Sequence, residues 1–184
     1  MTEAELIAEV KRLASDPKRR TTMVQKFPSD LRLPKFCHTH PLDPLPQSAT
    51  WEAVRAVEER LGFRLPVLLG KLWAEVANGG FGPGYGLVGI EGGYALDPTR
   101  LTLPELYFSM LDSYWEPVLD GPWPEKLVPI CHWGCGHESL IDCSTIEGQI
   151  VDFPEGSDLR PKGVTFARWM EDWVKGVELW GASH

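Results

Sequence analysis

The sequence predicts an α+β domain in which helices pack on an antiparallel or mixed sheet. Three observations predict this class. Amphipathic helical patterns dominate the first half of the chain, three short apolar runs separated by tight turns follow, and a strongly amphipathic segment closes the sequence. Helices, then hairpin-connected strands, then one more helix is the order expected when helices cover an antiparallel sheet.

The N-terminal part of the chain has a composition of its own. A capping box at Thr2 opens a helix predicted over residues 2–14. Five prolines then occur within residues 28–46, and each proline fixes φ and removes a backbone donor, so this stretch should be extended or looped. We therefore predict that residues 1–47 form an appendage, a helix plus a Pro-rich segment, and that residues 48–184 form the main domain.

Two helices are predicted at the start of the main domain. The first begins near Ser48 or Thr50 and runs to Leu61, with apolar residues at helical spacing. The second opens at Pro66, where a proline suits the first turn, and ends at residues 78–80, Asn-Gly-Gly, which tolerate positive φ. The chain is therefore expected to reverse sharply after the second helix.

The remaining elements are predicted from apolar alternation and caps. Thr165 caps a last helix whose apolar residues recur at spacings of three and one. Tight turns between the strands indicate a meander, which is antiparallel. The other expected elements are a short strand over residues 86–90, a helix over 103–114, and strands over 128–132, 139–143 and 149–153.

The charge balance argues against several classes of protein. The net charge is −8, and basic residues are concentrated between residues 11 and 35. An acidic body disfavours nucleic-acid binding and suits a basic protein partner. No apolar run is long enough for a bilayer, and Glu3 and Glu5 stand where a signal peptide needs basic residues, so we expect a cytoplasmic protein. The basic stretch is expected to be a solvated face, with a docking patch for something acidic as the alternative.

A glycine-rich passage covers residues 79–93. Within it, residues 84–89 match GxGxxG, but a helix precedes the loop and a strand follows it, which is the reverse of a dinucleotide site. No cofactor is therefore predicted. Phe81 and Tyr85 either pack onto the core or are exposed to a partner, because exposed aromatic residues are typical interface anchors.

The eight tryptophans are mostly expected to be buried, since the indole ring is large and apolar. Core or rim packing is also expected for Trp115, Trp123 and Trp133, with exposure of one of them for recognition as the alternative. Phe81, Tyr85 and Trp133 are therefore the candidate partner-binding residues. The tryptophans on apolar helix faces are expected in the core; they are Trp51, Trp73, Trp169 and Trp173.

The first two strands are predicted to form a hairpin across a three-residue turn at 134–136. This register places Cys131 opposite Ser139 and Cys143 opposite Leu127. Four residues along a strand span about 13 Å, so Cys143 cannot share a metal ion with Cys131.

A zinc site is the alternative reading of this hairpin. Cys131 and Cys135 have a ligand spacing used by zinc sites, and His137 adds a nitrogen, but a fourth ligand would have to come from the appendage. The other interpretation is that thiols line a tight hairpin as small apolar groups. The same register sets His132 opposite Glu138 as an ordinary polar pair.

Catalytic motifs are not recognised in the sequence. It lacks GxSxG, GxxxxGK[ST] and HExxH, and its carboxylates are expected on a solvated surface. Disulfides are not expected either, because a chain without an export signal meets a reducing compartment. The chain is therefore predicted not to be an enzyme.

Several segments together carry a family resemblance. The motif E-x-x-LG-x-x-LP at residues 58–66 precedes NGG at 78–80, and further support comes from residues 128–136, 140–143 and 166–173. These segments resemble the Smi/Knr family of the SUKH superfamily, over roughly residues 48–178. Residues 1–47 fall outside the resemblance.

The resemblance implies an α+β domain without catalytic residues. Bacterial members are largely immunity proteins that neutralise toxins, and fungal members are scaffolds in cell-wall and stress signalling. Recurring positions such as Gly62, Pro66 and Asn78 look structural, and the partner-binding surface varies between members. The resemblance thus favours a non-catalytic module that binds another protein, such as a basic toxin domain. A structural zinc protein and a regulatory scaffold are the alternatives.

Overall fold

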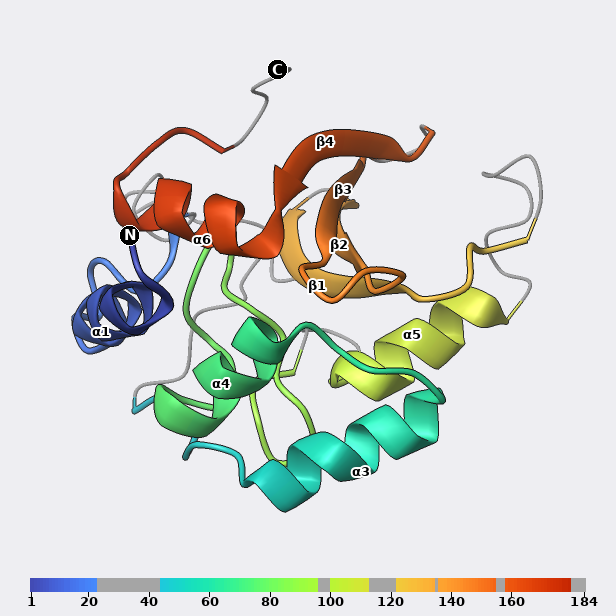
Figure 1. Cartoon of the computed structure of the whole chain (residues 1–184), viewed down its shortest axis with the longest axis horizontal. Coiled ribbons are helices and arrows are strands. Elements are labelled where there is room, and N and C mark those ends of the chain that lie inside the picture. Colours follow the sequence, from blue (N-terminus) through green and yellow to red (C-terminus); the bar gives the residue numbers. More distant parts are fainter. Residues whose placement is uncertain (23–43, 96–99, 113–121, 135, 155–157, 180–184) are drawn as a thin grey trace.

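The computed structural model describes residues 1–22, 44–95, 100–112, 122–134, 136–154 and 158–179 (Figure 1). Within these residues, five helices accompany a four-stranded antiparallel sheet, which confirms the predicted α+β class. None of these helices is both long and apolar enough to cross a membrane. The elements are α1 (Glu3–Ala14), α3 (Trp51–Leu61), α4 (Val67–Glu75), α5 (Leu103–Leu111), β1 (Leu127–Gly134), β2 (His137–Asp142), β3 (Gln149–Phe153), β4 (Arg160–Thr165) and α6 (Phe166–Val174).

The helix ends follow the local chemistry of the sequence. Thr2 closes the predicted capping box with Glu5, and the Thr50 side chain accepts a hydrogen bond from the Ala53 amide. Gly62 ends α3 in the left-handed conformation, with φ of 82°. These interactions satisfy backbone groups that a helix end leaves without intrahelical partners, so the chain can change direction there.

The sheet is a meander in the order β1-β2-β3-β4. Cys131 lies opposite Ser139, as predicted. The pairing then shifts by one residue, so Leu127 faces Asp142 rather than Cys143, and that part of the predicted register is wrong. A β-bulge adds an unpaired residue to one strand. A register predicted by counting residues outward from the turn does not include this extra residue.

The outer edge of β1 is covered by the glycine-rich segment. The Val88 amide donates to the carbonyl of Ile130 at 2.9 Å, and Leu87 forms an isolated bridge with Cys131. The strand expected over residues 86–90 is therefore only a single bridge. This contact occupies backbone groups that an edge strand would otherwise leave exposed.

β4 forms the other edge of the sheet, and the sequence analysis did not predict it. Its segment contains Pro161 and Gly163, and Gly163 has a φ of 69°. Both residue types disfavour strands, and here they lie at a sheet edge, where they are tolerated. Pairing with β3 therefore forms this strand against its local propensity.

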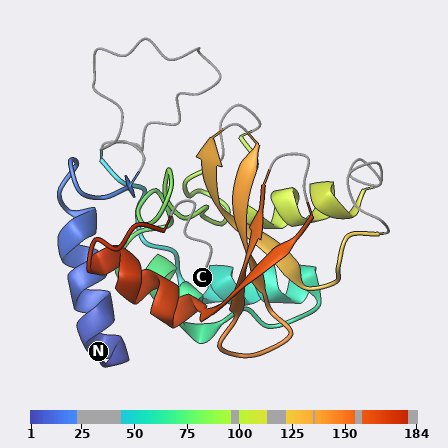
Figure 2. The same cartoon turned by 90° about the horizontal axis from the view of Figure 1, so that it is seen from above.

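The sheet is apolar on both faces. Ile141 and Ile150 lie in the main buried cluster, which includes residues of α1, α3, α4 and α6. Leu140 and Phe153 on the opposite face join a smaller cluster with Met110 of α5. Both faces of the sheet are therefore covered, the first mainly by helices and the second by Met110 together with Trp123 and Leu159 (Figure 2 shows the sheet from above).

The N-terminal helix packs into the main core. Leu6 and Val10 of α1 are 2% and 0% exposed, and α1 lies against α6 and α4 (Figure 1). Glu3 pairs with Lys71 of α4. The helix of the predicted appendage therefore shares a core with the main domain, while the domain boundary after residue 47 stays a prediction.

Candidate functional site

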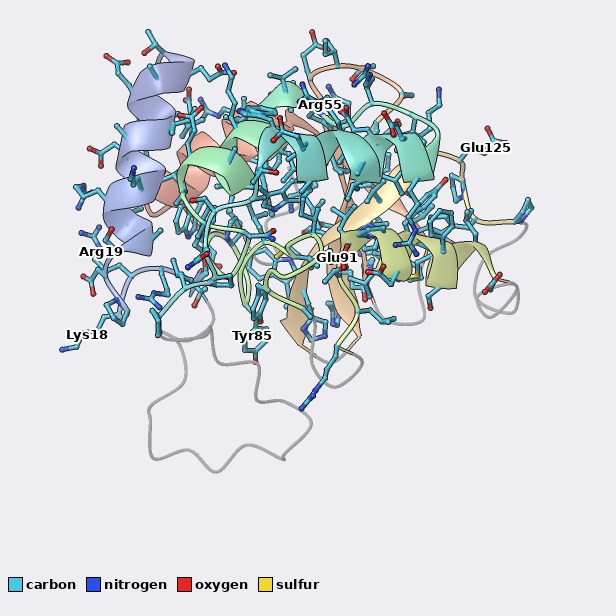
Figure 3. The ribbon with its side chains drawn as sticks, turned by 90° about the horizontal axis from the view of Figure 1, so that it is seen from below. Lys18, Arg19, Arg55, Tyr85, Glu91 and Glu125 are labelled. Carbon is cyan, nitrogen blue, oxygen red and sulfur yellow. The ribbon has the colours of Figure 1, made fainter. Side chains whose placement is uncertain are left out.

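The glycine-rich segment and the β1–β2 hairpin bring the conspicuous residues of the sequence together. Gly84 has a φ of 58°, and a Cβ there would lie 2.4 Å from the carbonyl oxygen of His132. Only glycine therefore permits this close approach. Next to it, the ring of Tyr85 lies 5.7 Å from the ring of His132 (Tyr85 is labelled in Figure 3).

The three candidate partner-binding residues are all buried. Phe81, Tyr85 and Trp133 are 0%, 5% and 4% exposed. Of the two positions considered for these rings, packed onto the core or exposed to a partner, the structure shows the packed one. Buried rings offer a partner little contact area. The predicted role of these three residues in partner binding therefore has no support from exposed surface and stays a prediction.

A chain of hydrogen bonds holds Trp133 in place. Its indole N–H donates to Ser139 Oγ at 2.8 Å, and Ser139 Oγ donates to Asp152 Oδ1 at 2.9 Å. Lys162, whose side chain is 7% exposed, donates from Nζ to Asp152 Oδ2 at 2.6 Å. This network links all four strands, and its satisfied polar groups indicate a structural role.

Asn78 fixes the start of the glycine-rich segment. It is 3% exposed, its amide donates to the carbonyls of Ile90 at 3.3 Å and Glu91 at 3.1 Å, and its Oδ1 accepts from the Ile90 amide at 2.8 Å. A buried side chain that satisfies three backbone groups is costly to replace. The NGG position therefore has the structural role that the resemblance implied.

The residues proposed as zinc ligands are only partly described. Cys131 donates from Sγ to the Pro83 carbonyl at 3.1 Å, and burial, with Asp152 and Glu138 nearby, raises the pKa of its thiol well above the ordinary value. Cys135 lies outside the described residues.

His137 pairs with Gly134 across the hairpin. Among the residues that are described, no three His, Cys, Asp or Glu side chains are arranged to hold a metal ion. The zinc hypothesis therefore gains no geometric support and stays a prediction.

His132 and Glu138 face each other across the hairpin, as the register predicted. Glu138 is half-buried, yet its Oε2 is sealed from solvent without a hydrogen-bond partner, and burial raises its pKa to about 7. The pKa of His132 is lowered, mainly by burial and to a smaller extent by the nearby His137. The Nδ1 atom of His132 accepts a hydrogen bond from the Gly134 amide at 3.1 Å. Both changes favour the neutral form, because burial disfavours charge.

The most exposed aromatic residue of the described helices is one that the sequence placed in the core. Trp51 is 41% exposed, whereas Trp73, Trp169 and Trp173 are buried as expected. The prediction for Trp51 is wrong because its contacts cover only part of the ring; one of them is with Gly70 of α4, where a Cβ would lie 3.2 Å from Cζ3.

Two further exposed apolar residues belong to α4 and to the β2–β3 turn. Val67, 47% exposed, is one helical turn from Gly70 on α4, and Ile146, 69% exposed, is in the β2–β3 turn. That turn reaches the start of α4, since a Cβ on Gly148 would lie 2.6 Å from Pro66 Cγ. We call Trp51, Val67 and Ile146 the α3–α4 surface.

The α3–α4 surface has acidic neighbours. Glu52, which pairs with Arg55 at 2.8 Å, follows Trp51 in the chain, and Glu147 follows Ile146; both carboxylates are exposed. Periodicity alone could not find this surface, because Trp51 has the same helical spacing as buried residues. The useful signal was Gly70, a glycine inside a helix, which often marks a close approach.

These features define a class of protein. It is an α+β domain whose described residues show neither a metal-ligand group nor a recognised catalytic motif, and whose exposed large apolar side chains include Trp51 of α3, Val67 of α4 and Ile146 of the β2–β3 turn. The model of the SMI1 / KNR4 family (SUKH-1) matches residues 48–172, more than half of the chain, and the chain belongs to this family.

Family membership confirms the resemblance and extends over α3 to α6. It is consistent with an immunity-type or regulatory module that binds a protein partner. No curated protein and no solved structure matched the chain.

Proposed function

We propose that this protein is an immunity-type module that binds and neutralises a toxin or effector protein, and that it does so without catalysis. The observation that carries the proposal is the α3–α4 surface on a domain of the SMI1 / KNR4 family. An exposed tryptophan on α3, with exposed aliphatic side chains on α4 and in the β2–β3 turn, has the composition of an interface centre, where aromatic residues contribute most of the binding energy.

The negative net charge of the chain supports a basic protein as the partner. The chain carries a net charge of −8, and Glu52 and Glu147 border the α3–α4 surface. A basic toxin domain, such as a nuclease with a basic substrate cleft, would be attracted to such a surface and oriented by it. Trp51 would then enter an apolar depression of the toxin while the carboxylates meet basic residues around it.

The test is co-expression with the product of the neighbouring gene, the expected toxin. We expect a stable complex in a pull-down and rescue of host growth. Trp51→Glu should weaken the complex by roughly a hundredfold and abolish rescue, since a charge would replace the aromatic anchor. Leu111→Glu is the matched control, because Leu111 is 41% exposed but lies at the end of α5, outside this surface.

Two results would contradict the proposal. If the neighbouring product neither binds nor is neutralised, the assignment as its immunity protein is wrong. If Trp51→Glu and Leu111→Glu bind equally well, the toxin uses another surface.

A further inference from the structure

The segment that follows α1 differs in charge from the rest of the protein. Lys11, Lys18 and Arg19 are exposed, and none of them forms an ion pair with a described residue, whereas Arg12 pairs with Glu9. Figure 3 shows Lys18 and Arg19 together beyond the end of α1. In a chain of net charge −8, this is a local excess of available positive charge. We call Lys11, Lys18 and Arg19 the basic segment.

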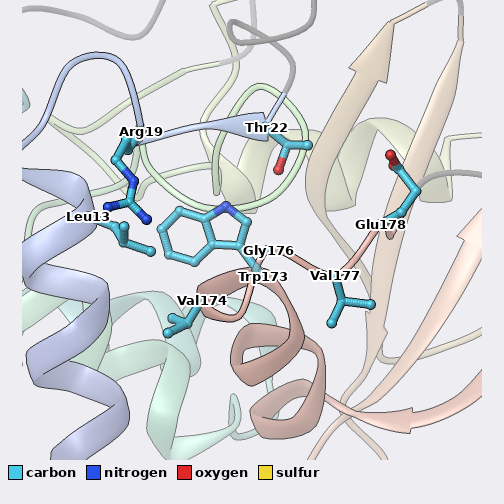
Figure 4. Close-up of a pocket in the computed structure, with 8 residues that line it drawn as sticks. All are labelled: Leu13, Arg19, Thr22, Trp173, Val174, Gly176, Val177 and Glu178. Carbon is cyan, nitrogen blue, oxygen red and sulfur yellow. The ribbon is translucent and has the colours of Figure 1, made fainter.

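A pocket of about 220 Å³ lies beside Arg19 (Figure 4). The indole of Trp173 lines the pocket, and Leu13, Val174 and Val177 supply further apolar parts of its wall. Arg19 reaches the pocket from one side and Glu178 borders it on another. Its volume is below the range of about 300–1,000 Å³ typical for drug-sized ligands, so it suits a single apolar side chain.

A second pocket borders the same part of the chain. It has a volume of about 480 Å³, and its lining includes Lys11, Arg20, Gln47 and Ser48. Arg20 is 5% exposed, so a guanidinium is held within the wall. The basic segment is thus flanked by two pockets of mixed polar and apolar lining, one that contains Trp173 and one that contains Lys11 and Arg20.

We propose that the basic segment and its two pockets dock an acidic, extended segment of a partner protein, which inserts one apolar side chain against Trp173. The carboxylates of that segment meet Arg19 and Lys18 and extend toward Lys11. An apolar anchor next to complementary charges combines affinity from the pocket with orientation from the charges.

A protein segment fits better than a nucleic acid or a membrane. Glu178 borders the pocket on a different side from Arg19, so a continuous run of phosphates would meet a carboxylate (Figure 4). The body of the protein is also acidic, which opposes a long polyanion that extends past the basic segment. A peptide can place its few carboxylates on the Arg19 side only.

The test uses two short fluorescent peptides and the full-length protein. One peptide has a central leucine flanked by glutamates, and the other has lysines in place of the glutamates. We expect fluorescence anisotropy to show binding of the acidic peptide only, weakened roughly tenfold by high salt. Arg19→Glu and Val177→Glu should each weaken binding by roughly tenfold or more, through the charge and the pocket respectively.

Matched controls separate this site from the rest of the surface. Arg55→Glu reverses an exposed charge on α3, away from Arg19 in Figure 3, and should leave peptide binding unchanged. Trp51→Glu should also leave it unchanged, so failure of the toxin proposal and failure of this one are distinguishable. Circular dichroism melts of each variant confirm that the fold is retained.

Three outcomes would overturn the proposal. The first is that neither peptide binds, or that both bind equally. The second is that Arg19→Glu and Arg55→Glu weaken binding to the same extent, which would indicate a diffuse charge effect. The third is that an RNA oligonucleotide or anionic phosphatidylserine vesicles bind in an Arg19-dependent manner while the acidic peptide does not.

Discussion

The glycine-rich segment and the α3–α4 surface both carry aromatic rings, but they place them in opposite environments. Phe81 and Tyr85 stand in a loop without regular structure and are almost fully buried, whereas Trp51 stands on a regular amphipathic helix and is 41% exposed. Local conformation therefore does not decide which ring a partner can reach. The deciding factor is the residue that the tertiary fold places against each ring.

The glycines show how the two regions differ. In the loop, Gly84 lets the backbone approach β1 closely, so the neighbouring rings are drawn into the core. On α4, Gly70 lets the ring of Trp51 approach closely, yet the residue stays 41% exposed. Glycine thus permits a close contact in both regions, but only in the loop do the other neighbours bury the rings.

The largest expected effect is on the buried side of this comparison. Gly79→Ala combines a φ of 83° with a Cβ only 2.6 Å from the backbone nitrogen of Gly89, and we expect it to cost about 3–5 kcal/mol of unfolding free energy. Gly92→Ala is the control, because its φ is 78° but nothing lies within 4 Å; it should cost about 1–2 kcal/mol. Urea denaturation measures both, and equal losses would show that close packing of the loop is unimportant.

An intermediate effect is expected at the hairpin and depends on pH. The pKa of Glu138 is about 7 in the folded protein against an ordinary value of 4.5, so between these values the folded state holds a proton that the unfolded state has lost. Stability should therefore fall as pH rises through this window, by roughly 1–3 kcal/mol, and remain low above it.

Glu138→Gln removes this dependence. Its unfolding free energy should match that of the wild type near the lower end of the window and exceed it by roughly 1–3 kcal/mol above the upper end. Glu147→Gln, on the exposed β2–β3 turn, is the matched control and should follow the wild-type profile. If the two variants show the same pH profile, the carboxyl of Glu138 is not sealed from solvent.

The smallest expected effect is on the exposed side of the comparison. Trp51→Ala should cost only about 1 kcal/mol of unfolding free energy, because much of the ring is already in contact with water. Thermal and urea melts measure this change. A loss as large as the roughly 3–5 kcal/mol of a core tryptophan truncation would assign Trp51 to the core.

The helices were the most predictable part of this fold. Thr2, Thr50 and Thr165 cap the helices whose starts they predicted, and each does so through contacts within four residues of itself. The predicted hairpin register holds where Cys131 meets Ser139 and His132 meets Glu138, and it fails beyond the irregularities on both sides, at Leu127 and at Gly134, which pairs with His137. Caps are predicted reliably because they depend on residues close in the sequence. The strand register is predicted less well, because each bulge shifts all the pairs beyond it.

Elements that depend on distant partners were missed. β4 contains a proline and a glycine, and only its pairing with β3 makes it a strand. The exposed position of Trp51 depends on a glycine 19 positions further along the chain, at Gly70. The pocket at Trp173 likewise joins α1, the segment after it and the end of α6, which no spacing in the sequence connects.

By itself, the sequence determined the fold class, the helix starts and the family, because caps, periodicity and turn residues act through near neighbours. The tertiary structure alone decided which aromatic rings are buried and where cations meet a cavity. Burial is a property of what the remaining chain places on a side chain, and this depends on contacts between residues that are far apart in the sequence.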